Sequence, residues 1–307
     1  MIVLALLAVQ TLFAVSYLAT REIATAVDPW AWAWMRSAAA SLILALLAMG
    51  RGPLGLRRSE SVRWAVLALL GVSCNQFFFI WGLAHTTPSH AGIANLAIPI
   101  HTYILACLFG REKASWGGWI GVLLSAGGVA ALLLSGPSAG DGATLGGDLL
   151  VLTNALSYAG FLVLARDHIP GRDAIRSTSL LSILGLAWIS LAAAPAAARQ
   201  DWTGLGGSTW AWCGYAVVGG TVGAYLLNLW VLARAPASLV AVFICLQPMI
   251  VSLLSVGLGY EKAGAALAVS MSLTITGVLV TTSCARVARA APVRAAPVRA
   301  EPVQPPA

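Results

Sequence analysis

The chain has 307 residues, of which 59% are hydrophobic and only 9% are charged, and its mean hydropathy is +0.85. Soluble domains carry about 45–50% apolar and about 25% charged residues, so a soluble fold of this size could not bury so much apolar surface. The composition indicates a protein surrounded by lipid. Five cysteines and four histidines are scattered without ligand spacing, so neither a disulfide framework nor a metal or cofactor site is expected.

Ten apolar stretches of roughly 17–24 residues are long enough to cross a bilayer. In lipid every backbone amide has to bond within its own segment, so helices are expected. We therefore predict an all-α integral membrane protein with ten transmembrane helices. The stretches are Ile2–Thr20, Trp30–Met49, Val62–Leu83, Ala91–Phe109, Trp116–Leu134, Gly147–Leu164, Ser177–Ala194, Ala211–Ala233, Ser238–Leu258 and Gly264–Thr282.

A polar break divides these stretches into two groups of five. We predict a first five-helix unit over residues 1–136, a linker over 137–145 and a second unit over 146–284. The remaining residues, 285–307, are basic and rich in proline and are expected to be disordered. No Lys or Arg precedes the first stretch, which is also longer than the apolar part of a signal peptide, so we expect a transmembrane helix there.

The basic residues are distributed unevenly between the two sides of the predicted membrane. Fourteen Lys and Arg residues follow the even-numbered stretches or lie in the tail, and three lie in the opposite connections. Basic loops stay on the cytoplasmic side, so we predict a multi-pass plasma-membrane protein with both termini in the cytoplasm. The same bias accounts for the net charge of +7 without a nucleic-acid partner.

The second unit repeats the first at an offset of 149 residues, with matches at residue types that rarely coincide by chance. Since each unit has an odd number of helices, the second has to enter the membrane from the opposite side. This is the inverted-topology repeat of many secondary transporters, with the binding site near the midplane. The matched pairs include Trp81 and Trp230, Pro99 and Pro248, Gly110 and Gly259, Glu112 and Glu261, and Lys113 and Lys262.

Each unit ends in a proline, about ten apolar residues, Gly-x-Glu and a helix that contains glycine. Together with Arg36 and the sequence Gly146-Gly147-Asp148, this pattern resembles the EamA family of the drug/metabolite transporter superfamily over residues 1–283. The resemblance implies a 5+5 inverted fold, solute transport that is often export of amino acids or related metabolites, and no bound cofactor. Small four-helix relatives use a glutamate in their first helix for cationic drugs, whereas Gln10 lies there in this chain.

Polar side chains inside the apolar stretches are the candidates for a solute pathway, because such groups tend to face the bundle interior. Each could instead hold two helices together by a hydrogen bond. We expect Asn75, Asn154, Tyr158, Tyr225 and Gln247 to converge in one central space. The full set is Gln10, Tyr17, Arg36, Asn75, Gln76, Asn95, His101, Asn154, Tyr158, Tyr225, Asn228 and Gln247.

Two of these residues, and two prolines in the apolar stretches, leave alternatives open. Arg36 could hold a carboxylate or phosphate, bond freed helix carbonyls, or extend to the interface. His101 could relay protons or be a bonded core residue. Pro99 and Pro248 each remove a backbone donor and could form hinges or simple packing kinks.

Two further groups are expected to have structural roles. Glu112 and Glu261 follow glycines at helix ends and could cap the helices that come next. Two stripes of small residues are expected to be packing seams, within the chain or for a homodimer. The stripes are Gly117, Gly121 and Ser125 in one helix, and Ala266, Ser270 and Thr274 in another.

The sequence thus favours a secondary transporter, an exporter of small metabolites such as amino acids, with a small-molecule solute and the lipid bilayer as partners. The alternative is a multidrug or cation efflux carrier. An intramembrane enzyme would require a nucleophile with a partnered histidine or paired metal ligands, and a channel would require a filter loop. Neither pattern is present in the sequence, so no enzyme is expected.

Overall fold

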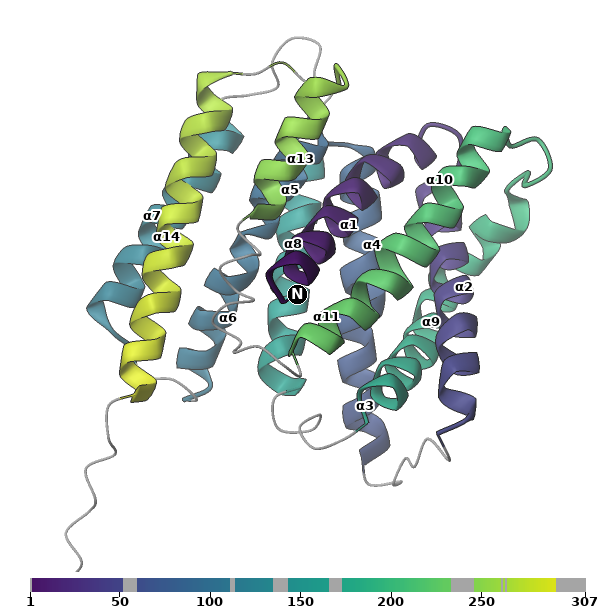
Figure 1. Ribbon diagram of the computed structural model, residues 1–307, viewed down its shortest axis with the longest axis horizontal. Helices are drawn as coiled ribbons and strands as arrows, with labels where there is room; N and C mark the ends of the chain where they lie inside the picture. Colours follow the sequence, from purple (N-terminus) through teal and green to yellow (C-terminus); the bar gives the residue numbers. More distant parts are fainter. Residues whose placement is uncertain are drawn as a thin grey trace, which may run out of the picture.

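The computed structural model describes residues 2–51, 60–110, 114–134, 143–165, 173–232, 246–260, 262 and 264–290. Over these ranges the chain is helical and contains no strand, so the all-α prediction is confirmed (Figure 1). The elements are α1 (Ile2–Ile23), α2 (Pro29–Met49), α3 (Ser61–Ala68), η2 (Leu69–Cys74), α4 (Asn75–Ala84), α5 (Pro88–Asn95), α6 (Ala97–Leu108), α7 (Trp116–Leu134), α8 (Leu145–Ala165), α9 (Ala174–Arg199), α10 (Gly207–Val217), η3 (Val218–Gly223), α11 (Ala224–Leu232), α13 (Leu246–Gly257) and α14 (Ala265–Ala290).

Six helical segments of the described chain are long and apolar enough to cross a membrane. Three shorter apolar helices, in α7, α13 and α14, accompany them. Large apolar side chains such as Leu4, Trp116 and Leu253 are more than two-thirds exposed, as expected for a surface that faces lipid. The six segments are Ile2–Ile23, Pro29–Met49, Ser61–Ala84, Pro88–Leu108, Leu145–Ala165 and Ile175–Arg199.

Two differences from the predicted elements have local causes. The predicted helix Ala91–Phe109 is divided at Leu96 into α5 and α6, just before Pro99, which has no backbone N–H to continue the ladder. At the other end of the chain α14 continues to Ala290, so residues 285–290 are helical and not part of a disordered tail. Alanine and arginine, which dominate that segment, are strong helix formers. Residues 291–307, Glu112 and Glu261 lie outside the described ranges.

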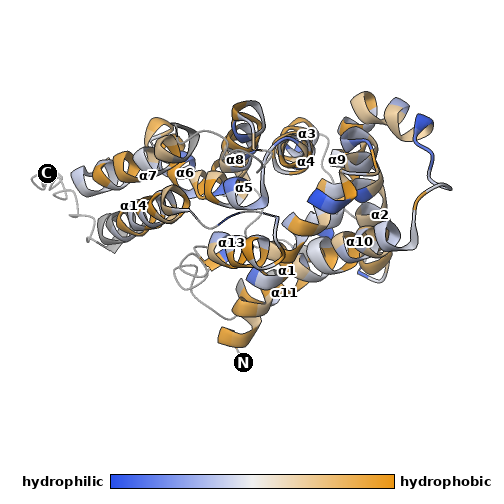
Figure 2. Ribbon diagram, turned by 90° about the horizontal axis from the view of Figure 1, so that it is seen from above, coloured by the Kyte–Doolittle hydropathy of each residue, from blue (hydrophilic) through white to orange (hydrophobic). Residues whose placement is uncertain are grey.

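The helices are arranged as a bundle with a separate pair at one end. Helices α7 and α14 lie side by side, while α2 packs on α9 at the opposite end (Figures 1 and 2). Between them, α8 contacts α4 and α6, and α1 contacts α10, α11 and α13. The centre of the bundle is therefore formed by α1, α4, α5, α8 and α13.

Small residues join α7 to α14 at close range. The Ser125 hydroxyl donates to the Thr274 carbonyl oxygen over 3.1 Å. A Cβ at Gly121 would lie 2.6 Å from the Gly277 carbonyl oxygen, and a Cβ at Gly128 would lie 2.8 Å from that of Ser270. The predicted seams therefore pack on each other within one chain.

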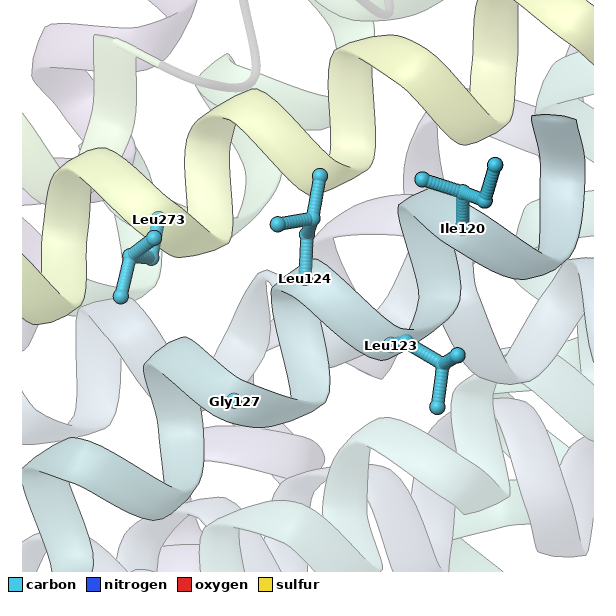
Figure 3. A pocket seen from close by; sticks show the side chains of 5 residues that line it. All are labelled: Ile120, Leu123, Leu124, Gly127 and Leu273. Atoms are coloured by element: carbon cyan, nitrogen blue, oxygen red, sulfur yellow. The ribbon is translucent and has the colours of Figure 1, made fainter.

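A second face of the same pair is open to its surroundings. There an apolar groove of about 420 Å³ is lined by Ile120, Leu123, Leu124 and Gly127 of α7 and by Leu273 of α14 (Figure 3). Its apolar lining fits a surface in contact with lipid chains.

Several structural details recur at the offset of 149 residues that relates the sequence repeats. Both π-helical turns, η2 and η3, occupy equivalent positions, and α6 and α13 have equivalent bounds. Gly110 (φ 66°) and Gly259 (φ 77°) are equivalent residues that end their helices in the left-handed conformation. Ser125 and Thr274, which bond each other, are also 149 residues apart.

The seam gives a direct test with a matched control. A Cβ at Gly277 would lie 2.5 Å from the Gly121 carbonyl oxygen and closer still to the Ser125 backbone nitrogen. We expect Gly277→Ala to destabilise the protein by about 1–3 kcal/mol through overpacking. Gly127→Ala points into open space, so it should leave the thermal unfolding midpoint in detergent unchanged or slightly higher. Equal midpoints for the two variants would contradict the close packing of α7 on α14.

Candidate functional site

A chain of hydrogen bonds crosses the centre of the bundle. The Asn75 side-chain amide donates to Asn154 Oδ1 over 2.6 Å, and the Asn154 amide donates to Asn95 Oδ1 over 2.7 Å. The Asn95 amide then donates to the Tyr17 hydroxyl over 2.6 Å. These residues come from α4, α8, α5 and α1, so one line of polar groups connects four helices.

This network is almost enclosed by protein. Asn154 and Tyr17 are 2% and 5% exposed, while Asn75 and Asn95 are half-buried. Each asparagine amide donates to the next residue of the line, but no described residue accepts the hydroxyl proton of Tyr17. Buried amides in an apolar bundle are stable when their partners are also in place. The line of polar groups thus links four helices, and the Tyr17 hydroxyl, where α1 contacts α5, can still donate a hydrogen bond.

Arg36 forms a second polar centre on α2. Its side chain is 8% exposed, and Nε donates to Thr221 Oγ1 over 3.0 Å. The Thr221 hydroxyl in turn donates to the Ala216 carbonyl oxygen over 2.8 Å, within the π-helical turn η3. π-turns displace backbone groups from the regular hydrogen-bond ladder and are frequent at functional sites. The bond between Arg36 and Thr221 is therefore a candidate part of the functional site.

Tyr225 connects Arg36 to a group of aromatic side chains. Tyr225 of α11 is within electrostatic range of both Arg36 and Tyr158. Tyr158 stacks on Phe161 with ring centroids 5.6 Å apart, and Phe13 meets Tyr225 edge-on at 6.1 Å. Arg36, Tyr158 and Tyr225 therefore belong to one neighbourhood formed by α2, α8 and α11.

Gln76 is linked to the same region through α2. The Ser37 hydroxyl donates to Gln76 Oε1 over 3.1 Å, next to Arg36 in the chain. The structure thus brings the predicted pathway residues together in two groups. The first group is Tyr17, Asn75, Asn95 and Asn154. The second is Arg36, Tyr158 and Tyr225, to which Gln76 is linked through Ser37.

The remaining predicted residues have no hydrogen bonds among the described residues that would connect them to either group. Gln10 is 2% exposed on α1, and Gln247 is half-buried on α13; neither has a hydrogen-bond partner among the described residues. His101 on α6 has a buried Nδ1 without a partner in the same ranges. Asn228 lies on α11, and its side chain falls outside the described part of the chain.

The two prolines lie in the first turns of α6 and α13. A Cβ at Gly92 of α5 would lie 3.2 Å from the Pro248 Cα, so α5 and α13 cross closely at this residue. The proline of the second unit is therefore packed on a helix of the first.

The sequence analysis missed a polar cluster where α4 ends and α5 and α8 begin. Asp148 is 3% exposed and accepts from the Thr86 hydroxyl, while His90 Nδ1 lies 3.0 Å from its other carboxylate oxygen. Arg21 Nη1 donates to the Thr86 carbonyl oxygen over 3.2 Å. An aspartate in the first turn of an apolar helix was the available signal, but its partners are about sixty residues away in the chain.

Two further contacts lie at the ends of the bundle. Near the cluster, the Glu22 carboxylate of α1 interacts with the Tyr260 hydroxyl and raises the pKa of Tyr260 to about 12. At the opposite end Arg51 Nη1 lies 3.4 Å from Asp173 Oδ2. We call these the His90 end and the Arg51 end of the bundle.

Comparison with known proteins identifies the family. A model of the EamA-like transporter family matches residues 1–134 and 145–283. The chain belongs to this family. The EamA assignment predicted from the sequence is confirmed, and with it a multi-pass membrane protein of the drug/metabolite transporter type.

Two curated relatives agree with the assignment. The uncharacterized transporter YetK of Bacillus subtilis (strain 168) is 25% identical over 70% of this chain and 66% of its own length. The uncharacterized transporter YyaM of the same organism is 24% identical over 81% of this chain and 84% of its own. The chain thus spans just under two thirds of YetK.

The structural comparison concerns the fold alone. A crystal structure described only as that of a protein superposes with a TM-score of 0.64 at 21% identity, over 92% of this chain and 97% of its own.

The asparagine network predicts a stability effect. Asn154→Leu would leave the Asn75 side-chain amide and Asn95 Oδ1 without their partner, and two interhelical bonds in a membrane bundle contribute about 1–2 kcal/mol together. We expect a lower thermal unfolding midpoint in detergent. Thr153→Val is the matched control, since Thr153 is exposed on the same helix and bonds only the Leu149 carbonyl. If Asn154→Leu unfolds at the same temperature as Thr153→Val, the network does not hold the helices together.

Proposed function

We propose that this protein is a secondary transporter that exports small polar metabolites, such as amino acids, by alternating access. The observation that carries the proposal is the polar centre of the bundle. Hydrogen-bonded amides, three tyrosines and one arginine lie inside an otherwise apolar set of helices, where polar groups mark solute or ion pathways. The family assignment supports transport, and the substrate and the direction are part of the proposal.

The proposed architecture is ten transmembrane helices in two inverted units, over residues 1–136 and 146–284, with 137–145 as the linker. The family model matches two consecutive segments of similar length. The π-turns, the left-handed glycines and the bounds of α6 and α13 all recur at the offset of 149 residues.

The contact between α7 and α14 has the self-complementary form that a two-fold axis produces. Gly121 of the first unit approaches Gly277 of the second, and the equivalent residues Gly128 and Ser270 approach each other in the same way. An inverted repeat would relate these two contacts by its pseudo-two-fold axis.

Alternating access requires that the two ends of the bundle open in turn. The His90 end is joined by the His90–Asp148 pair and by the interaction of Glu22 with Tyr260. The Arg51 end carries the Arg51–Asp173 contact, whose side chains are 47% and 34% exposed. Exposed ion pairs contribute little, about 0–1 kcal/mol, so the Arg51 end is the easier one to open. We propose that this end faces the cytoplasm and receives solute for export.

The alternative of a cation or multidrug efflux carrier is disfavoured by charge. A cationic solute in the polar centre would approach the buried guanidinium of Arg36, and like charges in a low dielectric repel strongly. A second copy of the chain as a partner stays a prediction; the small-residue seams are occupied within one chain.

Transport can be tested before the solute is identified. Cells that express the protein should release at least one small metabolite in excess, as measured by mass spectrometry of the medium. The purified full-length chain in liposomes should then exchange that metabolite in saturable counterflow. Excess release without exchange by the purified protein, or no release at all, would contradict the proposed function.

The orientation follows from the distribution of basic residues and can be tested by cysteine labelling. Gly50 and Thr203 are exposed and lie at opposite ends of the bundle. In a chain without native cysteines, we expect Thr203→Cys to react with an impermeant thiol reagent in intact cells, and Gly50→Cys to react only after permeabilisation. The reverse pattern would invert the topology and place both termini outside.

A further inference from the structure

Arg36 carries a buried charge that no acidic side chain among the described residues compensates. The ion pairs of the described residues are Arg51–Asp173 and His90–Asp148, and neither involves Arg36. Buried charges in proteins are normally paired, because an isolated one loses its hydration without a substitute. The acidic residues outside the described ranges, Glu112, Asp141, Asp167, Glu261 and Glu301, all lie outside the apolar stretches of the sequence.

The guanidinium is also only partly hydrogen-bonded. Of its five N–H donors, the structure pairs the one on Nε, with Thr221. No described residue accepts from Nη1 or Nη2. Because Thr221 holds Nε, the two terminal nitrogens form a fixed fork, whose geometry matches the two oxygens of a carboxylate.

We infer that the transported solute bears a carboxylate, and that Arg36 binds it end-on through Nη1 and Nη2; the inference rests on the proposed function and specifies its substrate class. The solute supplies the missing counter-charge while it occupies the centre. Tyr225 and Tyr158, whose hydroxyls have no hydrogen-bond partner among the described residues, are the adjacent donors. The rings of Phe13 and Phe161, beside these tyrosines, offer an apolar surface for the rest of a small molecule.

The charge at this position favours a carboxylate over a phosphate. A phosphate monoester carries about two negative charges at neutral pH and is usually held by several cationic groups or helix N-termini. Apart from Arg63, at the edge of its stretch, Arg36 is the one Lys or Arg that lies inside an apolar stretch of the sequence. One positive charge with neutral neighbours is matched by one carboxylate.

The experiment uses the purified full-length chain in liposomes and measures competition against counterflow of the exported metabolite. The probes are lactate with lactamide, leucine with leucinamide, and glycerol 3-phosphate. Each carboxamide keeps the size of its acid and removes the negative charge. We expect each effective acid to compete about tenfold or more better than its amide, as loss of a charge-assisted bond predicts, and better than the phosphate.

Variants assign the effect to Arg36. Arg36→Gln should remove the preference for acid over amide and most of the flux, while Arg36→Lys should retain the preference with weaker competition. Arg199→Gln, the same substitution at an exposed position, should leave both unchanged. Elution as a single species and the unfolding midpoint check that each variant folds. If Arg36→Gln does not fold, the inference is tested by how much better the acid competes than its amide in the wild type and in Arg36→Lys. A preference for the acid in both, with weaker competition in Arg36→Lys, supports the inference, and equal competition by acid and amide overturns it.

The outcomes separate this inference from the proposed function. Counterflow in which amides compete as well as acids, or an acid preference that survives in Arg36→Gln, would overturn the carboxylate site and leave the transporter in place. A preference for glycerol 3-phosphate would replace the carboxylate by a phosphate. Absence of saturable counterflow of any metabolite would overturn both proposals.

Discussion

The structure depends on one constraint: inside an apolar bundle, a polar group has to find its partner within the protein. Helices satisfy the backbone, and the side chains follow the same rule. Asn75, Asn95 and Asn154 bond in line, and Asp148 is held by Thr86 and His90. Some uncharged groups, such as His101 Nδ1, have no partner among the described residues, but Arg36 is the buried charge that satisfies the rule only in part. That exception is why the centre of the bundle, rather than the polar cluster at its end, is proposed as the solute site.

The helices differ in how firmly they are joined, and this difference suits a carrier. Helices α7 and α14 pack backbone to backbone along small residues, with no room for an added methyl group at Gly121, Gly128 or Gly277. The central helices pack on one another through the buried apolar cluster of Leu83, Val151 and Val251, but they are also linked by single polar contacts and interrupted by breaks such as Leu96 and the two π-turns. Rigid-body movement around a fixed site, as expected for alternating access, would use the second kind of contact.

The fold was largely readable from the sequence, but the site was readable only as a set of candidates. Apolar length predicted the spans, and Tyr17, Asn75, Asn95 and Asn154 were selected because amides and phenols are costly in lipid. Their pairing could not be predicted, because it depends on which helices are neighbours. The Asp148–His90 pair was missed for the same reason. The helix break at Leu96 was missed because a break near a proline can fall on either side of the proline.

Locking the His90 end tests alternating access most directly. The side chains of Glu22 and Tyr260 approach each other there, so cysteines at both positions, in a chain without native cysteines, can be joined by a short bis-methanethiosulfonate cross-linker that spans the two side chains. We predict that counterflow of the exported metabolite by the purified protein falls to background once the two cysteines are cross-linked and returns after reduction, while each single-cysteine variant stays active throughout. Undiminished counterflow through fully cross-linked protein would contradict the account.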